Sequence, residues 1–415
     1  MADTVANLDE LRLLLEELCC DLCRFEHVIR DGLAPEAVRI DREYWLGTPG
    51  AFADIRVAPA GQPPYFVEVK YGYTNEMLVR HLGRKYASAA TTDAAAAKKI
   101  VLVIDRGSRA GWERLQQELT SQLHEGLLLE VWDETRLLSL LAERFGVGIH
   151  GITAEDLLDV RQVIDRAKGF HAFGGSSLAE YDHDPLKADL LWHFGFWRLK
   201  QLRSTGRSTP RDILPPGQYP AVAVLLADLC SFSSYVRDTS DAEIVRESLT
   251  AFYSKARYQI INSGGMLYQF AGDEAIGFFG MPDHAEGFTD AVLDTARALC
   301  RIGESVSQHW QRRIDRVQNA AGLHVGVALG DLQIVSLRPF SRLHIGAIGD
   351  CINVASRLLA LAGPSEIVLS NAFHQRLDED NQTRCSEIEP VDARNLGRIR
   401  AWKLSSAADR PSGKR

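Results

Sequence analysis

One apolar stretch, residues 219–228, constrains the fold of this 415-residue chain more than any other feature, because it ends in an aspartate. It reads Tyr-Pro-Ala-Val-Ala-Val-Leu-Leu-Ala-Asp, which is long enough for a buried strand and too short for most helices. Residues 229–233, Leu-Cys-Ser-Phe-Ser, follow. Their serines and cysteine make the segment small and polar enough for a tight turn, whose backbone N–H groups we expect to face an anion. We therefore expect a central strand that carries Asp228 to one edge of a sheet.

A second aspartate, Asp273, lies between two β-prone runs, and Gly272 before it predicts a hairpin with a glycine turn. A helix-length segment, residues 241–263, separates the two motifs and stops at a pair of glycines. If the strands are neighbours, this order of strand, helix and hairpin brings both carboxylates to one sheet edge. A pair of carboxylates in that position is suited to hard divalent cations.

Three short motifs follow one another along the C-terminal half: Ala-Asp228-Leu-Cys-Ser-Phe-Ser, Gly272-Asp273-Glu and Ile348-Gly-Asp-Cys-Ile-Asn353-Val-Ala-Ser-Arg357-Leu. In this order and spacing they resemble the catalytic domain of class III nucleotide cyclases, from residue 221 to about residue 404. The resemblance implies a ferredoxin-like α+β domain that works as a homodimer with its sites at the interface. It also implies conversion of a nucleoside triphosphate to a 3′,5′-cyclic nucleotide and pyrophosphate.

The resemblance assigns roles to the motif residues. Asp228, the Leu229 carbonyl and Asp273 are the expected ligands of two Mn²⁺ or Mg²⁺ ions in each active site. Asn353 and Arg357 are the expected catalytic residues; they lie four apart and so share one helix face. Phosphate contacts are expected from Cys230, Ser231, Phe232 and Ser233, with Ser231 where relatives commonly have glycine, and from Arg394.

Base recognition departs from the family pattern. Adenylate cyclases of this class have a lysine at the position of Gln269 and an Asp or Thr at that of Gly346, and guanylate cyclases have Glu and Cys there. Neither purine code is present, whereas Gln269 offers a donor and an acceptor to a pyrimidine edge and Tyr268 adds bulk. The chain thus resembles the bacterial Pycsar pyrimidine cyclases, which make cyclic UMP or cyclic CMP on phage infection to activate a separate effector. UTP or CTP is favoured as the substrate, and ATP remains the alternative.

The N-terminal residues 1–150 alternate strands and helices and predict an α/β domain. Within it, Asp54 is followed by Glu68 and Lys70 in a pattern that resembles the restriction-endonuclease-like fold, where the carboxylates would hold Mg²⁺. Ordinary alternation of polar residues on a solvated strand gives the same pattern. A nuclease with a nucleotide-sensing cyclase-like domain is therefore the alternative, as is a scaffold that only senses or dimerises.

The expected organisation is an N-terminal domain (1–150), a helical connector and linker (151–218), a cyclase domain (219–405) and a disordered tail (406–415). The net charge of −8 and the lack of a basic tail argue against a nucleic-acid or membrane partner. The N-terminus lacks the pattern of a signal peptide, and no apolar stretch is long enough for a membrane span. Seven scattered cysteines indicate reduced thiols, so we expect a cytoplasmic protein.

Overall fold

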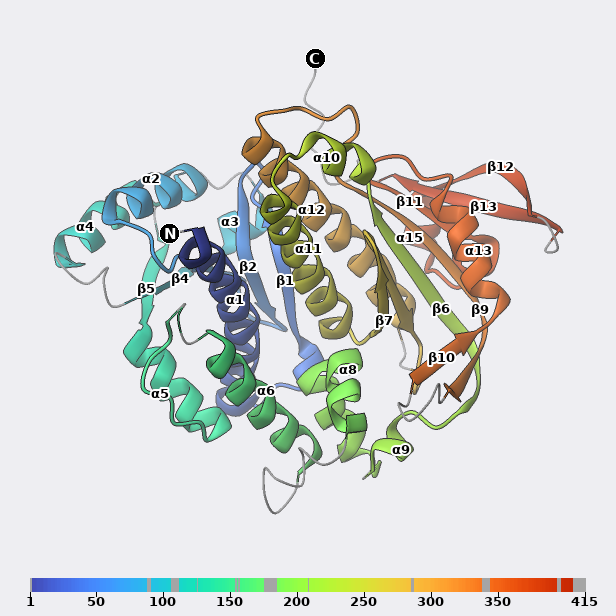
Figure 1. The fold of residues 1–415 in the computed structure, drawn as a ribbon, viewed down its shortest axis with the longest axis horizontal. Helices are drawn as coiled ribbons and strands as arrows, with labels where there is room; N and C mark the ends of the chain where they lie inside the picture. The colour runs from blue at the N-terminus through green and yellow to red at the C-terminus, as the bar shows by residue number, and fades with distance from the viewer. Residues whose placement is uncertain are drawn as a thin grey trace. The chain divides into compact units, whose positions relative to one another are not determined.

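A computed structural model shows two compact units, Met1–His171 and Ala172–Arg415, each with its own sheet (Figure 1). No helix in the part of the chain that it describes is long and apolar enough to cross a bilayer. Arg394 and the expected tail at residues 406–415 lie outside the described residues. These are residues 2–87, 91–105, 112–124, 126–153, 155, 157–174, 185–207, 209–284, 287–337, 344–393 and 397–405.

The N-terminal unit is built on a five-stranded sheet in the order β1-β2-β3-β4-β5. The first three strands are antiparallel, and β3, β4 and β5 are parallel. The strands are β1 (Val38–Trp45), β2 (Phe52–Pro59), β3 (Tyr65–Val69), β4 (Lys99–Ile104) and β5 (Leu128–Asp133). The helices are α1 (Ala2–Arg30), α2 (Asn75–Tyr86), α3 (Thr92–Ala96), α4 (Trp112–Gln122), α5 (Glu134–Phe145) and α6 (Leu157–Phe173).

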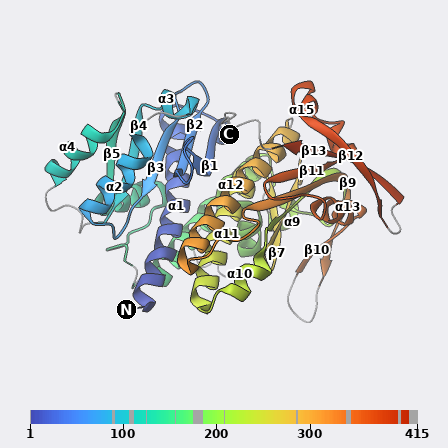
Figure 2. The same ribbon diagram turned by 90° about the horizontal axis from the view of Figure 1, so that it is seen from above.

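Helices pack on both faces of this sheet, which explains why β3 and β4 are buried along almost their whole length. Phe66 and Leu102 share a core with α2 and α4, whereas α1 packs against β2 and β3. Successive side chains of a strand point to opposite faces of the sheet. Val67 and Val101, both fully buried, therefore point to the face opposite Phe66 and Leu102. Figure 2 shows the same strands and helices from above.

The first strand begins later than its sequence suggests. Residues 36–40 predict a strand, but Pro35–Ala37 forms a 3₁₀ turn and β1 starts at Val38. Proline at the first position of the turn fixes a helical φ, which delays the extended conformation. Pairing with β2 then carries β1 as far as Trp45, opposite Phe52.

The C-terminal unit contains an eight-stranded sheet in the order β12-β13-β11-β9-β6-β8-β7, with β10 paired to β9. Its strands are β6 (Gly217–Leu229), β7 (Met266–Ala271), β8 (Glu274–Phe279), β9 (Leu323–Leu337), β10 (His344–Ile348), β11 (Glu366–Ser370), β12 (Cys385–Ala393) and β13 (Gly397–Ser405). Its helices are α8 (Pro185–Ser204), α9 (Pro210–Ile213), α10 (Phe232–Asp238), α11 (Ala242–Asn262), α12 (Phe288–Ile314), α13 (Asp350–Leu359), α14 (Asn371–His374) and α15 (Glu379–Thr383).

Four of these strands form the centre of the unit, in the order β9-β6-β8-β7 with antiparallel neighbours. The helix α11 connects β6 to β7, and α12 connects β8 to β9. This is the βαββαβ arrangement of ferredoxin-like folds. The expected fold class, an α/β region followed by a ferredoxin-like α+β domain, is confirmed.

The sequence of residues 322–337 predicts two strands joined by a hairpin around Gly330 and Asp331, and this prediction was wrong. Residues 323–337 form one strand, β9, which pairs with β6 on both sides of Gly330. Gly330 instead permits close packing of α13, because a Cβ atom there would lie 3.0 Å from the Cβ of Cys351. The sequence cannot separate these two uses of glycine, which are turn formation and close approach.

The aromatic segment at residues 190–200 packs within the C-terminal unit. It lies in α8, which contacts α11 and β7 and has a non-helical Gly195 at φ 69° and ψ 173°. Phe194, Phe196 and Trp197 are buried, whereas Trp192 is 46% exposed. His193 Nδ1 lies 2.6 Å from the carbonyl oxygen of Leu267, which fixes α8 to the edge strand β7.

Gly326 on β9 gives a direct test of how α13 is held. A Cβ atom at this position would lie 2.4 Å from the Ala355 carbonyl oxygen and 2.5 Å from the Leu359 nitrogen, both backbone atoms. Overpacking usually costs about 1–3 kcal/mol, and backbone atoms yield less readily than side chains. We predict that Gly326→Ala lowers the free energy of unfolding by about 3 kcal/mol in urea denaturation followed by circular dichroism.

Gly148→Ala is the matched control, because no heavy atom lies within 4 Å of its added Cβ. It should change the unfolding free energy by less than about 0.5 kcal/mol, as most surface substitutions do. Equal effects of the two substitutions would contradict this account of the packing of α13.

Candidate active site

Asp228 lies near the end of β6, the strand between β9 and β8. Residues 222–227 before it are at most 1% exposed, so an apolar strand places the carboxylate at the border of the core. The pairing register sets Glu274 of β8 opposite Asp228 on one side and His324 of β9 on the other.

Asp273 lies in the turn between β7 and β8, after Gly272 at φ 66°. Its carboxyl group lies close enough to that of Asp228 for the two charges to interact, because the pairing of β6 with β8 brings both residues to one edge of the sheet. Burial and the negative charge of Asp228 raise the pKa of Asp273 to about 7. Two carboxyl groups so close are stabilised either by a shared proton or by a cation.

His324 is a site residue that sequence reasoning missed. Its Nε2 atom lies 3.2 Å from Oδ2 of Asp228, and its Nδ1 atom lies 2.8 Å from the carbonyl oxygen of Ala362. Burial alone would lower the pKa of His324, but its hydrogen bonds to Asp228 and Ala362 outweigh burial and raise it. The only sequence signal was a histidine at the start of an apolar strand, since the register between β6 and β9 was unknown.

The turn after β6 has the conformation for which glycine is usually required. Ser231 adopts left-handed φ and ψ of 60° and 21°, which cost an L-residue roughly 1–2 kcal/mol. The N–H of Cys230 donates to the carbonyl oxygen of Gly322 at 3.0 Å, so it is not available to a phosphate. The N–H groups of Ser231, Phe232 and Ser233 remain as candidates, at the start of α10.

Asn353 and Arg357 lie on the exposed face of α13, whose opposite face buries Cys351, Ala355 and Leu358. Neither side chain has a hydrogen bond or an ion pair with any described residue. The helix thus presents both groups to solvent, without contact to the two aspartates of the same chain within the described ranges.

The positions expected to recognise the base lie on β7 and β10, which pair with β8 and β9 respectively and not with each other. Gln269 is exposed on β7, and Gly346 is buried on β10. The hydroxyl of Tyr268 accepts a hydrogen bond of 3.3 Å from the N–H of Ala347, and its ring stacks on Phe278 with 4.8 Å between centroids. The Tyr268 side chain therefore extends beside Gly346.

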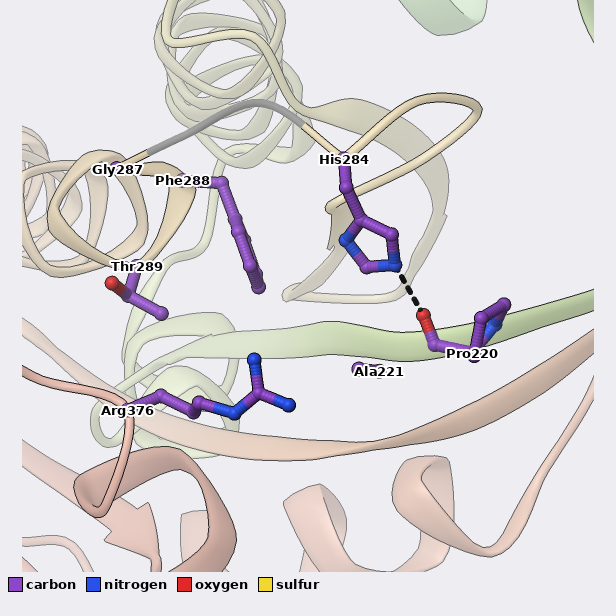
Figure 3. A pocket seen from close by; sticks show the side chains of 7 residues that line it. All are labelled: Pro220, Ala221, His284, Gly287, Phe288, Thr289 and Arg376. Carbon is purple, nitrogen blue, oxygen red and sulfur yellow. Dashed lines mark hydrogen bonds between the residues drawn. The ribbon is translucent and has the colours of Figure 1, made fainter.

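A cavity of about 460 Å³ lies at the opposite end of β6 from Asp228 (Figure 3). Pro220 and Phe288 line it, the guanidinium of Arg376 points into it, and His284 Nε2 lies 2.7 Å from the Pro220 carbonyl oxygen. None of the residues predicted for the active site lines this cavity.

In the N-terminal unit, the fold brings together Asp54 of β2 with Glu68 and Lys70 at the end of β3. Lys85 and Tyr86, at the end of α2, join them. The sequence pattern contained the first three residues and gave no sign of the other two.

Two solved structures are similar to part of this chain. The guanylyl cyclase Cya2 is 18% identical with a TM-score of 0.41, covering 46% of this chain and 93% of that one. The adenylyl cyclase CyaB from P. aeruginosa is also 18% identical with a TM-score of 0.41, covering 46% and 96%. TM-scores this low add nothing to the assignment.

Curated relatives also match less than half of the chain. An adenylate cyclase of Mycobacterium tuberculosis (strain H37Rv) is 25% identical over 191 residues, which are 45% of this chain and 40% of the relative. An uncharacterized protein of the same organism is 28% identical over 180 residues, 43% of this chain and 30% of the relative. The chain thus spans less than half the length of these relatives.

The family model described as adenylate and guanylate cyclase catalytic domain matches residues 214–406. The match includes all three motifs, the two aspartates at the end of β6 and in the β7–β8 turn, and the exposed pair on α13. Residues 214–406 are therefore a catalytic domain of the class III adenylate and guanylate cyclase family.

Proposed function

We propose that this protein is a nucleotide cyclase, which converts a nucleoside triphosphate to a 3′,5′-cyclic nucleotide and pyrophosphate. The ribose 3′ oxygen forms a bond to the α-phosphorus, loses its proton and displaces pyrophosphate. The placement of Asp228 and Asp273 at one edge of the sheet, within a domain of this family, is the observation that carries the proposal.

The two aspartates fit a divalent-cation site. Carboxylate and carbonyl oxygens are the ligands that Mg²⁺ and Mn²⁺ prefer, and a cation relieves the repulsion that raises the pKa of Asp273. Among the described residues, no group of three or more His, Cys, Asp or Glu side chains is placed to hold a metal. The Leu229 carbonyl and the substrate phosphates therefore have to complete the coordination. Bound cations would lower the pKa of the 3′-hydroxyl and offset the charge of the triphosphate.

His324 acts in this proposal as a positioning residue for Asp228. With Nδ1 donating to Ala362, Nε2 donates to Asp228 only in the protonated ring. The contact holds Oδ2 of Asp228 in place. It also supplies a positive charge next to the place where the triphosphate would bind.

Arg357 and Asn353 supply the second half of the proposed site. The guanidinium group of arginine stays charged and can bind two phosphate oxygens at once, so Arg357 stabilises the negative charge that develops on the α-phosphate. Asn353 orients the ribose. Their exposure and their lack of partners among the described residues support a site shared by two copies. We therefore propose a homodimer with two sites at its interface.

The side chains at the positions expected to recognise the base support a pyrimidine substrate, UTP or CTP. The Tyr268 side chain reaches Ala347 next to Gly346, so it fills space on the side where a purine-recognising residue is absent. Gln269 beside it is exposed and can pair with the donor and acceptor of a pyrimidine edge. The name of the M. tuberculosis relative, adenylate cyclase, favours ATP as the alternative.

The resemblance to Pycsar cyclases is the basis for a proposal about the role of this protein in the cell. We infer a cytoplasmic enzyme whose cyclic UMP or cyclic CMP activates a separate effector during antiphage defence. The restriction-endonuclease-like resemblance of the N-terminal unit belongs to the same proposal, and its β1–β5 sheet with α2 between β3 and β4 supports it.

The effect of Mn²⁺ on thermal stability tests whether Asp273 is a metal ligand. Asp273→Asn removes one of two repelling carboxylates, so the metal-free variant should melt no lower than the unmodified protein. Saturating Mn²⁺ should raise the melting temperature of the unmodified protein, since ligand at a hundred times its Kd adds about 2.7 kcal/mol. The variant should lose this rise, as measured by differential scanning fluorimetry.

Asp315→Asn is the control, because Asp315 is exposed at the end of α12 and asparagine accepts its left-handed backbone. It should keep the full rise with Mn²⁺. A rise that survives Asp273→Asn would place the metal elsewhere.

The proposed reaction is tested by incubating purified protein and Mn²⁺ with ATP, GTP, CTP and UTP separately and identifying products by mass spectrometry. We expect cyclic UMP or cyclic CMP as the main product. Arg357→Ala should reduce the rate by about 10²–10³-fold, because it removes one group that stabilises transition-state charge.

Asp228→Ala serves as the inactive control. Cyclic AMP as the main product would contradict the pyrimidine assignment and leave the cyclase assignment intact. Product formation that persists in Asp228→Ala would contradict the assignment of the site.

A further inference from the structure

Four charged side chains meet in the N-terminal unit, outside the cyclase domain. Asp54 comes from β2, Glu68 from β3, Lys70 from just after β3 and Lys85 from α2. Glu68 is fully buried and Lys70 is 4% exposed, and the side chains of Asp54 and Lys85 are 14% and 16% exposed. Charged groups this deep need partners, because each loses its hydration.

Glu68 is saturated with donors. Lys85 Nζ donates to both of its oxygens, at 3.1 Å and 2.8 Å, and Tyr86 Oη donates to Oε1 at 2.6 Å. Lys70 Nζ lies 2.7 Å from Oε2. Each carboxylate oxygen of Glu68 thus has two partners, and a metal ion would have to displace them.

Asp54 is held in the same way. Its Oδ2 atom accepts hydrogen bonds from Lys70 Nζ and, at 2.8 Å, from the N–H of Val69. Its Oδ1 atom lies 3.6 Å from Lys85 Nζ. Lys85 therefore bridges the two carboxylates that the nuclease-like pattern would assign to Mg²⁺.

The charges of the cluster cancel. Burial would raise the pKa of Asp54, but Lys70 and Lys85 outweigh it and lower that pKa, so Asp54 is ionised. Burial would lower the pKa of Lys70, but Asp54 and Glu68 raise it, so Lys70 is charged. Two carboxylates with Lys70 alone would carry a net charge of −1 and attract a cation. With Lys85 the sum is zero, and a divalent ion would meet two ammonium groups.

We propose that the Lys85 ammonium takes the place of a divalent cation between Asp54 and Glu68, so that this cluster is a metal site closed by its own lysine. The position of Lys85 is fixed by the helix that carries it. Leu78, Leu82 and Tyr86 bury one face of α2, and Thr74 caps its first turn. Among the described residues, Asp228 and Asp273 then remain as the proposed site for divalent cations. Phosphodiester cleavage by metal ions in the N-terminal unit would require Lys85 to withdraw.

The test measures Mn²⁺ binding to the full chain by electron paramagnetic resonance. All variants carry Asp228→Asn and Asp273→Asn, which remove the proposed cyclase metal ligands. This background should bind no Mn²⁺ at micromolar concentrations. Adding Lys85→Met should create one site per chain, at least tenfold tighter than any binding by the background, and adding Glu68→Gln to that variant should abolish it.

Lys70→Met is the matched control, since it makes the same change of side chain and of net charge in the same cluster. Its cluster carries the same net charge of −1, but Lys85 still lies between the two carboxylates, so this variant should bind Mn²⁺ at least tenfold more weakly than Lys85→Met. If Lys85→Met does not fold, as judged by circular dichroism, Lys85→Gln keeps a donor to Glu68 without the charge and replaces it.

Two results would overturn the proposal. One is Mn²⁺ binding by the background chain that depends on Glu68, since Lys85 would then not close the site. The other is a folded Lys85→Met or Lys85→Gln chain without a new site, since Lys85 would then have only a structural role. Both results are independent of whether the C-terminal unit is a cyclase.

Discussion

The placement of the Asp228 and Asp273 carboxyl groups at one edge of the sheet is the constraint on which the proposed cyclase chemistry depends. It exists because β6 and β8 pair antiparallel, which sets the end of one strand beside the turn that begins the other. The apolar run before Asp228 buries the strand, and the glycine turn holds Asp273 at the same edge. The fold thus maintains two unfavourably close acids in one place. Such an arrangement is costly unless a cation or a proton compensates it, and it is common at functional sites.

The two units treat paired carboxylates in opposite ways. In the C-terminal unit the acids are partly exposed, and His324 contacts only Asp228. The pair therefore keeps negative charge that a divalent cation can offset, and that cation can in turn bind a triphosphate. In the N-terminal unit Lys70 and Lys85 neutralise Asp54 and Glu68 within the chain. A short acidic motif in a sequence therefore does not by itself define a metal site. Whether such a motif can bind a metal ion depends on the cationic side chains beside it.

Much of the fold and of the candidate site could be predicted from the sequence, because some of the signals are local. Strand length, the stop at Gly264 and the glycine before Asp273 are read from neighbouring residues, and helical spacing placed Asn353 and Arg357 on one face of α13. The contact of His324 with Asp228 depends on the register between β6 and β9, which no local pattern encodes. Lys85 reaches Glu68 only because α2 packs on the sheet at one particular position. Gly330 was misread because glycine serves tight turns and close packing alike.

The central claim is that two copies of the chain complete each other's active site, and mixing two inactive variants tests it most directly. Asp228→Ala lacks the metal half and Arg357→Ala lacks the transition-state half, so in a mixed dimer one of the two sites is intact. Equal amounts that exchange freely should regain about a quarter of the unmodified activity, because half of the dimers are mixed. Mixed dimers confirmed by tagged co-purification but without any regained activity would contradict a shared site.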